Sequence, residues 1–333
     1  MPNFIPLVKS SHLHPFISTF EHIGVPLERS LEYVGLNPDT VFEGKAFVPE
    51  YAVWHLLEHV SHTQGIENLG SHISEQYALN SYGDFGEHLS NAPNLYVALQ
   101  RLIHDLQAHS NYQNYWLQEN GRYIELCRIG TPGINVGRHQ IEQHIMVFFI
   151  ALVRGYLGEN WLPDYLKVQS RSNIGVRLSP VLSNVHLSYS HAFGVLPMRK
   201  EQLLNSSSKA ETTLFAKQRN KDHPEPSIQS QLQTLLNQNV FHSDGSIKCV
   251  SSALGLSERQ LQRELAVLGT TFRELTGNAI RLRAKEMLSE VDRPIQCIAS
   301  DLGYNNPKNF SRAFRALTGL SPSEYRQIVR GAQ

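Results

Sequence analysis

The feature that most constrains the fold is a pair of helical segments that occurs twice near the carboxyl end. Residues 246–255 and 294–303 match at a constant offset of 48, with SIKCVSSALG in the first copy and PIQCIASDLG in the second. In each copy apolar residues recur at helical spacing and a glycine closes the pattern, which predicts a short helix followed by a sharp corner. Because the copies share this pattern, we expect the same local fold twice.

A second helix is predicted after the second corner. Asn306 can accept hydrogen bonds from the free N–H groups at its start, and Pro307 fits its first position. One apolar stripe must face inward, and it contains Phe310, Ala313, Phe314 and Leu317. The opposite face carries Lys308, Ser311, Arg312 and Arg315. A helix whose exposed face is basic can enter the major groove of DNA, where arginine and lysine contact guanine edges and phosphates.

The first copy predicts a matching helix. Ser257 and Gln260 have the spacing of a capping box, and three leucines follow on an inward face. Its outward face carries Arg259, Gln262 and Arg263. Residues 272–291 connect the units and would span about 30 Å as a helix. Since a turn of DNA is about 34 Å, the two outward faces could enter successive major grooves.

This tandem arrangement resembles the DNA-binding domain of the AraC/XylS family of bacterial transcription regulators. The similar motifs are LGLS and LQR in the first unit, and IASDLGY, FSRAF and TGLSPSEYR in the second, and they cover about the last hundred residues. The resemblance implies base contacts from Arg259, Gln262, Arg263, Lys308, Asn309 and Arg312. One departure is Gly277 inside the connecting helix, where glycine costs about 1 kcal/mol relative to alanine.

Charge is distributed unevenly along the chain. The 333 residues carry no formal net charge, but residues 227–333 contain 13 Lys+Arg against 9 Asp+Glu, or +4, which leaves −4 on the remainder. A modestly basic module on a mildly acidic body suits site-specific DNA binding. Three scattered cysteines favour a reducing cytoplasm. The longest apolar run, Ile145–Val153, is too short to cross a membrane.

No enzymatic motif stands out in the sequence. It contains no G-x-S-x-G, H-E-x-x-H, Walker or G-x-G-x-x-G motif, and its 16 histidines are scattered. A catalytic site needs a nucleophile and a base in a defined arrangement, and no such set is recognisable. We therefore expect a protein that is not an enzyme, with no catalytic residues, no cofactor and no resident metal.

The first half predicts an α+β domain with helices and an antiparallel sheet, followed by an all-α tandem helix-turn-helix domain. Helical patterns cover residues 16–35, 49–63, 94–109 and 136–158, and strands are predicted at 112–118, 123–129, 166–170 and 184–190. Polar segments rich in serine and proline place the boundaries. We expect a domain at 1–205, a linker at 206–226 and the DNA-binding domain at 227–333.

A hairpin is the clearest local signal in the first half. Asn120-Gly121 is the preferred pair for a two-residue type I′ turn, and pairing outward places Leu117 opposite Ile124. One face would then belong to the core. The other mixes aromatic and polar side chains, including Trp116 and Tyr123, so it is either an effector pocket or a partly solvated sheet.

The first half also resembles the arabinose-binding, or effector, domain that precedes the same DNA-binding module. The resemblance rests on the order of features from Phe85 through the Trp161-Leu162-Pro163 sequence to the leucines at 203 and 204. It implies a domain that senses a small effector and forms a homodimer, without identifying the residues that contact the effector. The resemblance to this family also implies an activator that acts with RNA polymerase.

The sequence therefore predicts a regulator that binds double-stranded promoter DNA in response to a small organic effector. A ligand-independent regulator whose first half only dimerises is an alternative. A third reading is a metal sensor that uses the helix face formed by His55, His59 and His62, since these side chains recur at i, i+4 and i+7.

Overall fold

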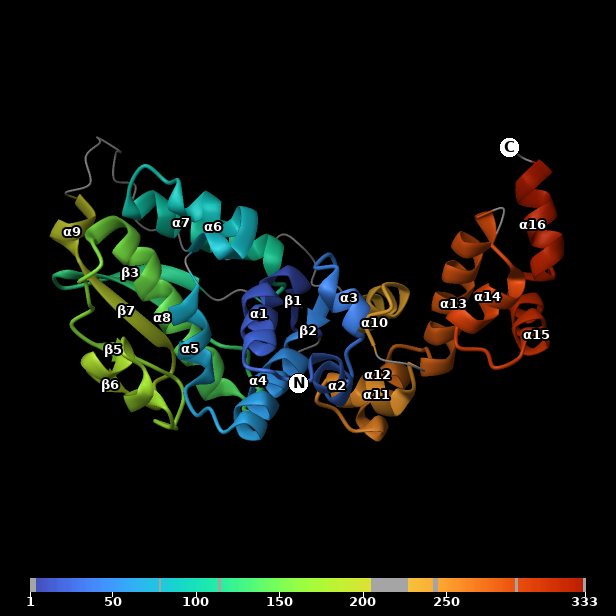
Figure 1. The fold of residues 1–333 in the computed structure, drawn as a ribbon, viewed down its shortest axis with the longest axis horizontal. Coiled ribbons are helices and arrows are strands. Elements are labelled where there is room, and N and C mark those ends of the chain that lie inside the picture. Colours follow the sequence, from blue (N-terminus) through green and yellow to red (C-terminus); the bar gives the residue numbers. More distant parts are fainter. Residues whose placement is uncertain are drawn as a thin grey trace.

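The computed structural model describes residues 4–77, 79–112, 115–204, 227–241, 245–290 and 293–331. The molecule is elongated, with the first half of the chain at one end, the first helix-turn-helix unit packed against it, and the second unit at the far end (Figure 1). The predicted linker at 206–226 lies outside the described residues.

The amino-terminal part consists of short helices and a two-stranded antiparallel sheet. Its elements are β1 (Leu7–Lys9), α1 (His14–His22), α2 (Leu27–Tyr33), α3 (Pro38–Phe42), β2 (Phe47–Pro49) and α4 (Glu50–Gln64). The prediction of one helix over residues 16–35 was wrong, because the chain turns at Gly24 and Pro26 and forms two helices. Proline cannot donate the backbone hydrogen bond that a continuous helix requires.

Four further helices flank a second sheet. They are α5 (Leu69–Gln76), α6 (Gly83–Ser90), α7 (Leu95–His109) and α8 (Arg138–Leu157), and α9 (Lys200–Leu204) follows the last strand. The start of α7 is fixed by Asn94, whose side chain accepts a hydrogen bond from the Val97 amide. Helices α7 and α8 share one apolar core with the sheet.

The second sheet has five strands in the order β3-β4-β7-β5-β6. The strands are β3 (Tyr115–Asn120), β4 (Tyr123–Arg128), β5 (Leu166–Lys167), β6 (Leu187–Ser188) and β7 (Gly194–Arg199). Neighbours are antiparallel except β5 and β6, which pair in parallel over two residues. The central strand β7 was not predicted, because Pro197 argues against a central strand. Strand β5 pairs with β7 only at Val195. Pro197 therefore has a pairing partner on β4 and none on β5.

The hairpin formed by β3 and β4 is present, but its turn differs from the prediction. Asn120 pairs with Tyr123 and Leu117 pairs with Leu126, so the turn residues are Gly121 and Arg122. The predicted pairing was wrong by two residues. Since side chains alternate with a period of two, this shift leaves the assignment of faces intact, and Ile124 and Leu126 are buried in the core as predicted.

The carboxyl-terminal part is entirely helical among its described residues. Its helices are α10 (Ile228–Asn237), α11 (Ile247–Ala253), α12 (Glu258–Val267), α13 (Phe272–Ser289), α14 (Ile295–Asp301), α15 (Pro307–Thr318) and α16 (Pro322–Gly331). Helix α13 continues through Gly277, where an added Cβ would only touch Leu317 at an ordinary distance of 3.5 Å. Its start carries a capping box formed by Thr271 and Glu274.

Apolar packing joins the first helix-turn-helix unit to the amino-terminal part. One continuous cluster of buried side chains includes residues of α1 to α4 together with leucines of α10 and α12, among them Leu232 and Leu261. The second unit has a separate and smaller core, made of Ala284, Leu288, Ile298, Ala299, Phe310 and Phe314. The first unit is therefore anchored to the body, and the second unit is stabilised mainly by its own few side chains.

Candidate nucleic-acid interface and internal cavity

The first candidate contact helix is α12. Ser257 caps it by accepting a hydrogen bond from the Gln260 amide, and the Gln260 Oε1 accepts one from the Ser257 amide, so the predicted capping box is confirmed. Leu261 and Leu265 are buried, whereas Leu268 is 42% exposed. The three candidate contact residues Arg259, Gln262 and Arg263 are exposed. Helix α12 thus presents a polar face with two guanidinium groups to solvent.

The second candidate contact helix is α15. Asn306 accepts a hydrogen bond from the Lys308 amide, and Pro307 occupies the first turn, as predicted. Phe310 and Phe314 are buried, while Leu317, predicted to face inward, is 41% exposed near the end of the helix. The exposed face contains Lys308, Asn309, Arg312 and Arg315.

Two local interactions shape the exposed face of α15. The Arg312 Nη2 donates to the Asn309 Oδ1 at 2.6 Å, which aligns these two side chains on the surface. Ser311 is half-buried, and its hydroxyl donates to the Pro307 carbonyl of the same helix. Arg312 and Asn309 therefore form a paired polar group, whereas the Ser311 hydroxyl is already engaged.

One helix carries both units. Leu275 and Ala279, in the first half of α13, belong to the large core, and Ala284 and Leu288, in its second half, belong to the small core. From Leu275 to Leu288 the helix advances about 20 Å. The separation between the units is therefore set by a single helix with no described break. Figure 1 shows α12 and α15 on opposite sides of α13.

Backbone hydrogen bonds join the first unit to the body. The Asn37 amide donates to the Val240 carbonyl at 2.8 Å, and the Thr40 hydroxyl donates to the Asn239 carbonyl at 3.0 Å. Leu36 and Phe241 form an isolated antiparallel bridge. These contacts tie the loop after α10 to the segment between α2 and α3.

A buried glutamine anchors the start of the chain to the same unit. Gln231 on α10 accepts a hydrogen bond from the Ile5 amide at 2.6 Å and donates to the Ile5 carbonyl at 3.1 Å. The Ile5 carbonyl also accepts from the Asn111 side chain, next to the end of α7. The amino-terminal segment is thus hydrogen-bonded to both α10 and the loop that follows α7.

Two glycines allow close packing between the body and α11. A Cβ on Gly35 would lie 3.1 Å from both the Ala253 Cβ and the Cys249 carbonyl oxygen, and a Cβ on Gly255 would lie 2.4 Å from the Tyr51 ring. Cys249 also donates from its thiol to the Gly35 carbonyl at 3.6 Å. The equivalent cysteine of the second unit, Cys297, is exposed.

A cavity of about 140 Å³, partly open to solvent, lies within the amino-terminal half. Its wall is mostly aromatic and aliphatic, and includes Phe16, Trp54, Phe85, Leu102, Phe148 and Phe149. The cavity is comparable in size to the apolar cavity of about 150 Å³ that accommodates benzene. Glu50, Val53 and Trp54 bring α4 into this wall. Tyr51, on the same helix, packs against Gly255 of the first helix-turn-helix unit.

The cavity wall also contains buried polar groups. Burial lowers the pKa of His12 and of His144 to about 3, so both imidazoles are neutral near pH 7. Burial raises the pKa of Glu50, whose carboxylate accepts hydrogen bonds from the Ser110 and Thr131 hydroxyls. Arg128 lines the same wall and is 6% exposed. Sequence reasoning missed this group, because its members come from segments far apart in the chain.

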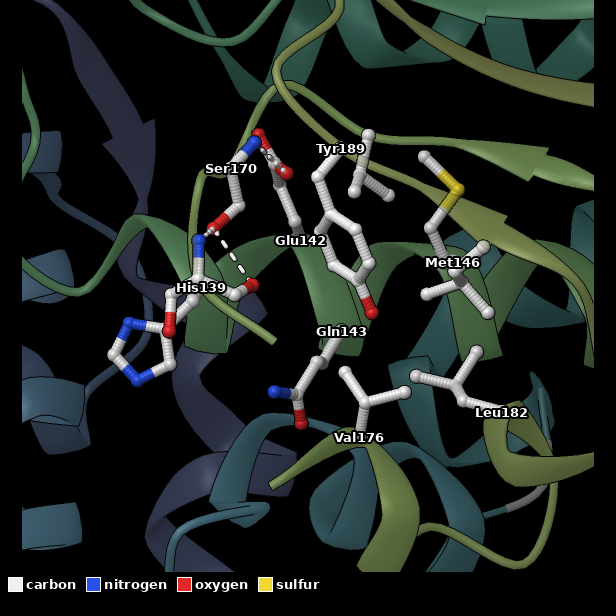
Figure 2. Close-up of a pocket in the computed structure, with 11 residues that line it drawn as sticks. His139, Glu142, Gln143, Met146, Ser170, Val176, Leu182 and Tyr189 are labelled. Atoms are coloured by element: carbon white, nitrogen blue, oxygen red, sulfur yellow. Dashed lines mark hydrogen bonds between the residues drawn. The ribbon is translucent and has the colours of Figure 1, made fainter. Parts of the chain in front are cut away.

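A second and much smaller pocket lies along α8. Figure 2 shows His139, Glu142 and Gln143 of α8 opposite Ser170, Val176 and Tyr189. The Glu142 carboxylate accepts a hydrogen bond from the Ser170 amide at 2.7 Å. The volume of about 10 Å³ is that of roughly one water molecule. This pocket is too small for an organic effector.

The residues predicted to contact an effector lie elsewhere. Trp116 and Tyr123 are on the face of the hairpin that points away from the core shared with α7 and α8, and neither lines the larger cavity. The Trp116 ring packs against Phe193, and the Tyr123 hydroxyl donates to the Asp164 carboxylate at 2.7 Å. Both side chains therefore have structural contacts on the outer face of the sheet.

The histidine face of α4 has aromatic contacts. The His59 ring stacks on Tyr33 with centroids 4.1 Å apart, and His55 is tilted against the same ring. His62 contacts the Glu58 carboxylate at 3.2 Å. Within the described ranges, no three histidine, cysteine, aspartate or glutamate side chains are grouped as metal ligands. No described helix is long and apolar enough to cross a membrane.

Two family models match the chain in separate regions. The model described as the amino-terminal arabinose-binding domain of AraC transcription regulator matches residues 24–172, and the model described as a helix-turn-helix domain matches residues 250–328. The first region contains the cavity wall contributed by α4, α7 and α8. The second contains both candidate contact helices.

Curated relatives and solved structures are similar over different lengths. An ornithine utilization regulator of Pseudomonas aeruginosa is 40% identical over 22% of this chain and 22% of its own length. The chain thus spans about a fifth of the length of the first relatives it matches. The uncharacterized HTH-type transcriptional regulator YisR of Bacillus subtilis is 24% identical over 82% of this chain and 77% of its own. The crystal structure of the transcriptional regulator CdpR from Pseudomonas aeruginosa is 20% identical, with a TM-score of 0.37, over 90% of this chain and 97% of that one.

Proposed function

Because the chain belongs to the AraC family of helix-turn-helix transcription regulators, we propose that it is a promoter-specific regulator whose DNA contacts change when a small organic molecule occupies the internal cavity. It is a DNA-binding regulator with an effector-binding amino-terminal domain. We further propose which residues contact DNA, where the effector binds, and how effector binding changes the DNA contacts. We propose domains at 1–205 and 227–333 joined by a linker at 206–226.

The DNA-binding proposal rests on two capped helices, α12 and α15, that each have an exposed polar face. The single helix α13 connects the units to which they belong. Arg259, Gln262 and Arg263 are exposed on α12, and Lys308, Asn309, Arg312 and Arg315 are exposed on α15. We assign these side chains to base and phosphate contacts. We give Ser311 a smaller part, because its hydroxyl already donates within α15. The rise of α13 is compatible with contacts in neighbouring major grooves of one duplex.

The proposal is tested by binding to DNA. Fluorescence anisotropy with duplexes from the region upstream of the regulator's own gene is expected to show salt-dependent binding to at least one site, about a thousandfold or more tighter than to random duplex. Equal affinity for every duplex would contradict the proposal. Footprinting on the same fragment would then give the two contacted segments.

We predict different roles for two arginines of α15. Arg312→Ala is expected to weaken binding by about 1–3 kcal/mol and to relax specificity at one base position, because Arg312 is aligned by Asn309 as a base-reading group. Arg315→Ala is expected to weaken binding to all sequences alike and to lower the salt dependence by about one phosphate contact. Anisotropy titrations on specific and random duplexes at several salt concentrations measure both effects.

The two variants serve as controls for each other, since both remove one exposed arginine from the same helix. If Arg312→Ala weakened binding equally on specific and random duplexes, the assignment of Arg312 to base recognition would be wrong. If Arg315→Ala changed the preferred base at one position, the assignment of Arg315 to a phosphate would be wrong.

Helix α4 supplies the proposed route from effector to DNA. One side of α4 contributes Glu50, Val53 and Trp54 to the cavity wall, and Tyr51 on the same helix contacts Gly255 of the first unit. A molecule that fills the cavity and shifts α4 would therefore change how the first unit packs on the body. Such a molecule acts only if it binds the DNA-competent arrangement more tightly than the other.

Ligand dependence separates this proposal from its alternative, a dimeric regulator with no effector. A ligand of the cavity would raise the melting temperature as its concentration rises and would change the affinity for the specific duplex. A regulator without an effector would show neither change with any compound. The cavity favours the effector-responsive reading.

Several further assignments follow the family. We propose that the protein acts in the cytoplasm as a homodimer, that it activates transcription through RNA polymerase, and that it has no enzymatic activity. Light scattering on and off DNA would measure the number of copies. A reporter fused to the bound promoter would establish the sign of regulation, and lower expression in the presence of the protein would contradict activation.

A further inference from the structure

We propose that the internal cavity binds a small, mainly apolar monocarboxylate, and that Arg128 receives the carboxylate. This inference deepens the proposed function, because it rests on the cavity being the effector site. It identifies the chemical class of the effector and the residue that selects it.

Arg128 is the proposed partner of the ligand carboxylate. Its side chain is buried, and its Nε donates to the Tyr115 hydroxyl at 3.1 Å. Among the described residues, its two Nη groups have no hydrogen-bond acceptor and no carboxylate oxygen within 4 Å. These Nη donors are not enclosed by protein, so a ligand in the cavity can reach them and supply acceptors. The forked pair of Nη groups matches the two oxygens of a carboxylate.

The nearby carboxylates are already engaged. Glu50 accepts hydrogen bonds from the Ser110 and Thr131 hydroxyls. Glu142 accepts from the Ser170 amide and lies 3.8 Å from Arg138. Both influence Arg128 only over a longer distance, through their charge. The Nη groups of Arg128 therefore remain available to a ligand in the cavity.

The charge balance favours an anion. Burial lowers the pKa of Arg138 and the nearby charge of Arg128 contributes to that shift, while the carboxyl groups of Glu142 and Glu50 offset the two arginines. Burial raises the pKa of one of these groups, Glu50, so that it takes up a proton more readily than an exposed glutamate. Glu50 therefore offsets the Arg128 charge less completely than an exposed glutamate would, and a carboxylate bound by Arg128 would add to that compensation.

Most of the rest of the wall is apolar, although among the described residues the Tyr82 hydroxyl and the His109 Nδ1 are buried there without a hydrogen-bond partner. Phe85 and Phe148 stack with their centroids 6.3 Å apart, and Tyr82 meets Phe148 edge to face at 4.9 Å. His12 packs against both Phe85 and His109, and its low pKa keeps it neutral. Aromatic walls favour ring edges and alkyl chains. The volume limits the ligand to roughly six to ten non-hydrogen atoms, by comparison with cavities that hold a single ring.

A sugar suits this wall poorly. A pentose exposes hydroxyl groups on every side, and each needs a hydrogen-bond partner when it is buried. Most of the wall offers carbon atoms instead. The arabinose in the description of the matching family model is thus a useful comparison compound, and we expect the cavity to discriminate against it.

Calorimetry and thermal shift on the full chain test the inference. The probes are phenylacetate, benzoate and hexanoate, each compared with its primary amide, and L-arabinose. At least one acid is expected to bind saturably and at least tenfold more tightly than its amide, and arabinose is expected not to bind. Equal binding of acid and amide, binding of arabinose instead, or no binding by any acid would overturn the inference.

Two variants assign the effect to the guanidinium. Arg128→Gln is expected to reduce acid affinity at least tenfold and to leave the weaker amide binding unchanged. Arg128→Lys keeps the charge without the fork, so its acid affinity should lie between the two, and it replaces Arg128→Gln should that variant fail to fold. Arg122→Gln, which removes an exposed arginine at the hairpin turn, is the charge-matched control. Acid binding that survives both Arg128 variants would overturn the assignment.

DNA measurements keep this inference distinct from the proposed function. If an acid binds through Arg128 but the affinity for the specific duplex does not change, the ligand assignment stands and ligand-dependent regulation fails. If a neutral compound changes DNA affinity while no acid binds, regulation by an effector stands and the carboxylate assignment fails.

Discussion

Replacing Phe310 with alanine is expected to unfold the second helix-turn-helix unit and to abolish specific DNA binding. Phe310 is fully buried in a small core, in which six of the described side chains are buried, and it packs against Tyr304 and Phe314. Removal of a buried phenylalanine costs about 3–5 kcal/mol, which is a large share of the stability of so small a unit. Hydrogen exchange measures the effect, and protection should be lost across α14 to α16 but kept across α10 to α12.

The control for this variant lies on the same helix. Leu317→Ala also removes an apolar side chain from α15, but Leu317 is 41% exposed, so the expected cost is below about 1 kcal/mol. Loss of protection in both units after Phe310→Ala would show that the two cores unfold together. Normal binding to the specific duplex would contradict the role given to α15.

The second large effect is expected for Gly255→Ala, at the contact between the first unit and the body. Gly255 has a φ of +68°, which disfavours any residue with a Cβ, and the new Cβ would lie 2.4 Å from the Tyr51 ring. The backbone cost is about 1–2 kcal/mol, and relief of the overlap adds about 1–3 kcal/mol. We expect the first unit to detach partly from α4. Exchange of the Asn37 amide, which donates to Val240, reports this directly.

The repeat supplies a matched control. Gly303 occupies the equivalent position in the second unit with a φ of +81°, but a Cβ there would have no atom within 4 Å. Gly303→Ala therefore carries the backbone cost without the overlap, and it should leave the Asn37 amide protected. If both variants exposed Asn37 equally, the contact between Tyr51 and Gly255 would not be what holds the first unit on the body.

The carboxyl-terminal helices were predictable from the sequence because their determinants are local. Ser257, Asn306 and Ser321 each accept hydrogen bonds at the start of the helix that follows, and the residues involved lie within three positions. The period of the apolar residues located the buried Phe310 and Phe314. The same reasoning failed at Leu317, since the end of the helix extends beyond the core it covers.

The amino-terminal half was predicted less completely, because its determinants are distant in sequence. The hairpin register shifted by two residues because the turn formed at Gly121-Arg122. Strand β7 was missed because Pro197 is tolerated only where β5 has ceased to pair. The cavity was missed altogether, since Glu50 on α4 and Arg128 on β4 meet only in the folded chain. Trp116 and Tyr123, which are prominent in sequence, lie on the other face of the sheet.

The single helix α13 has a consequence for the sites this protein would recognise. Since its first half belongs to one core and its second half to the other, the distance and the rotation between α12 and α15 are both fixed by the same rod. Adding one base pair between two half-sites would displace the second by about 3.4 Å and turn it around the duplex axis. We infer that a changed base pair within a half-site is tolerated better than a changed spacer length. Genomic searches for target sites should therefore keep the spacer length constant and allow the bases of the half-sites to vary.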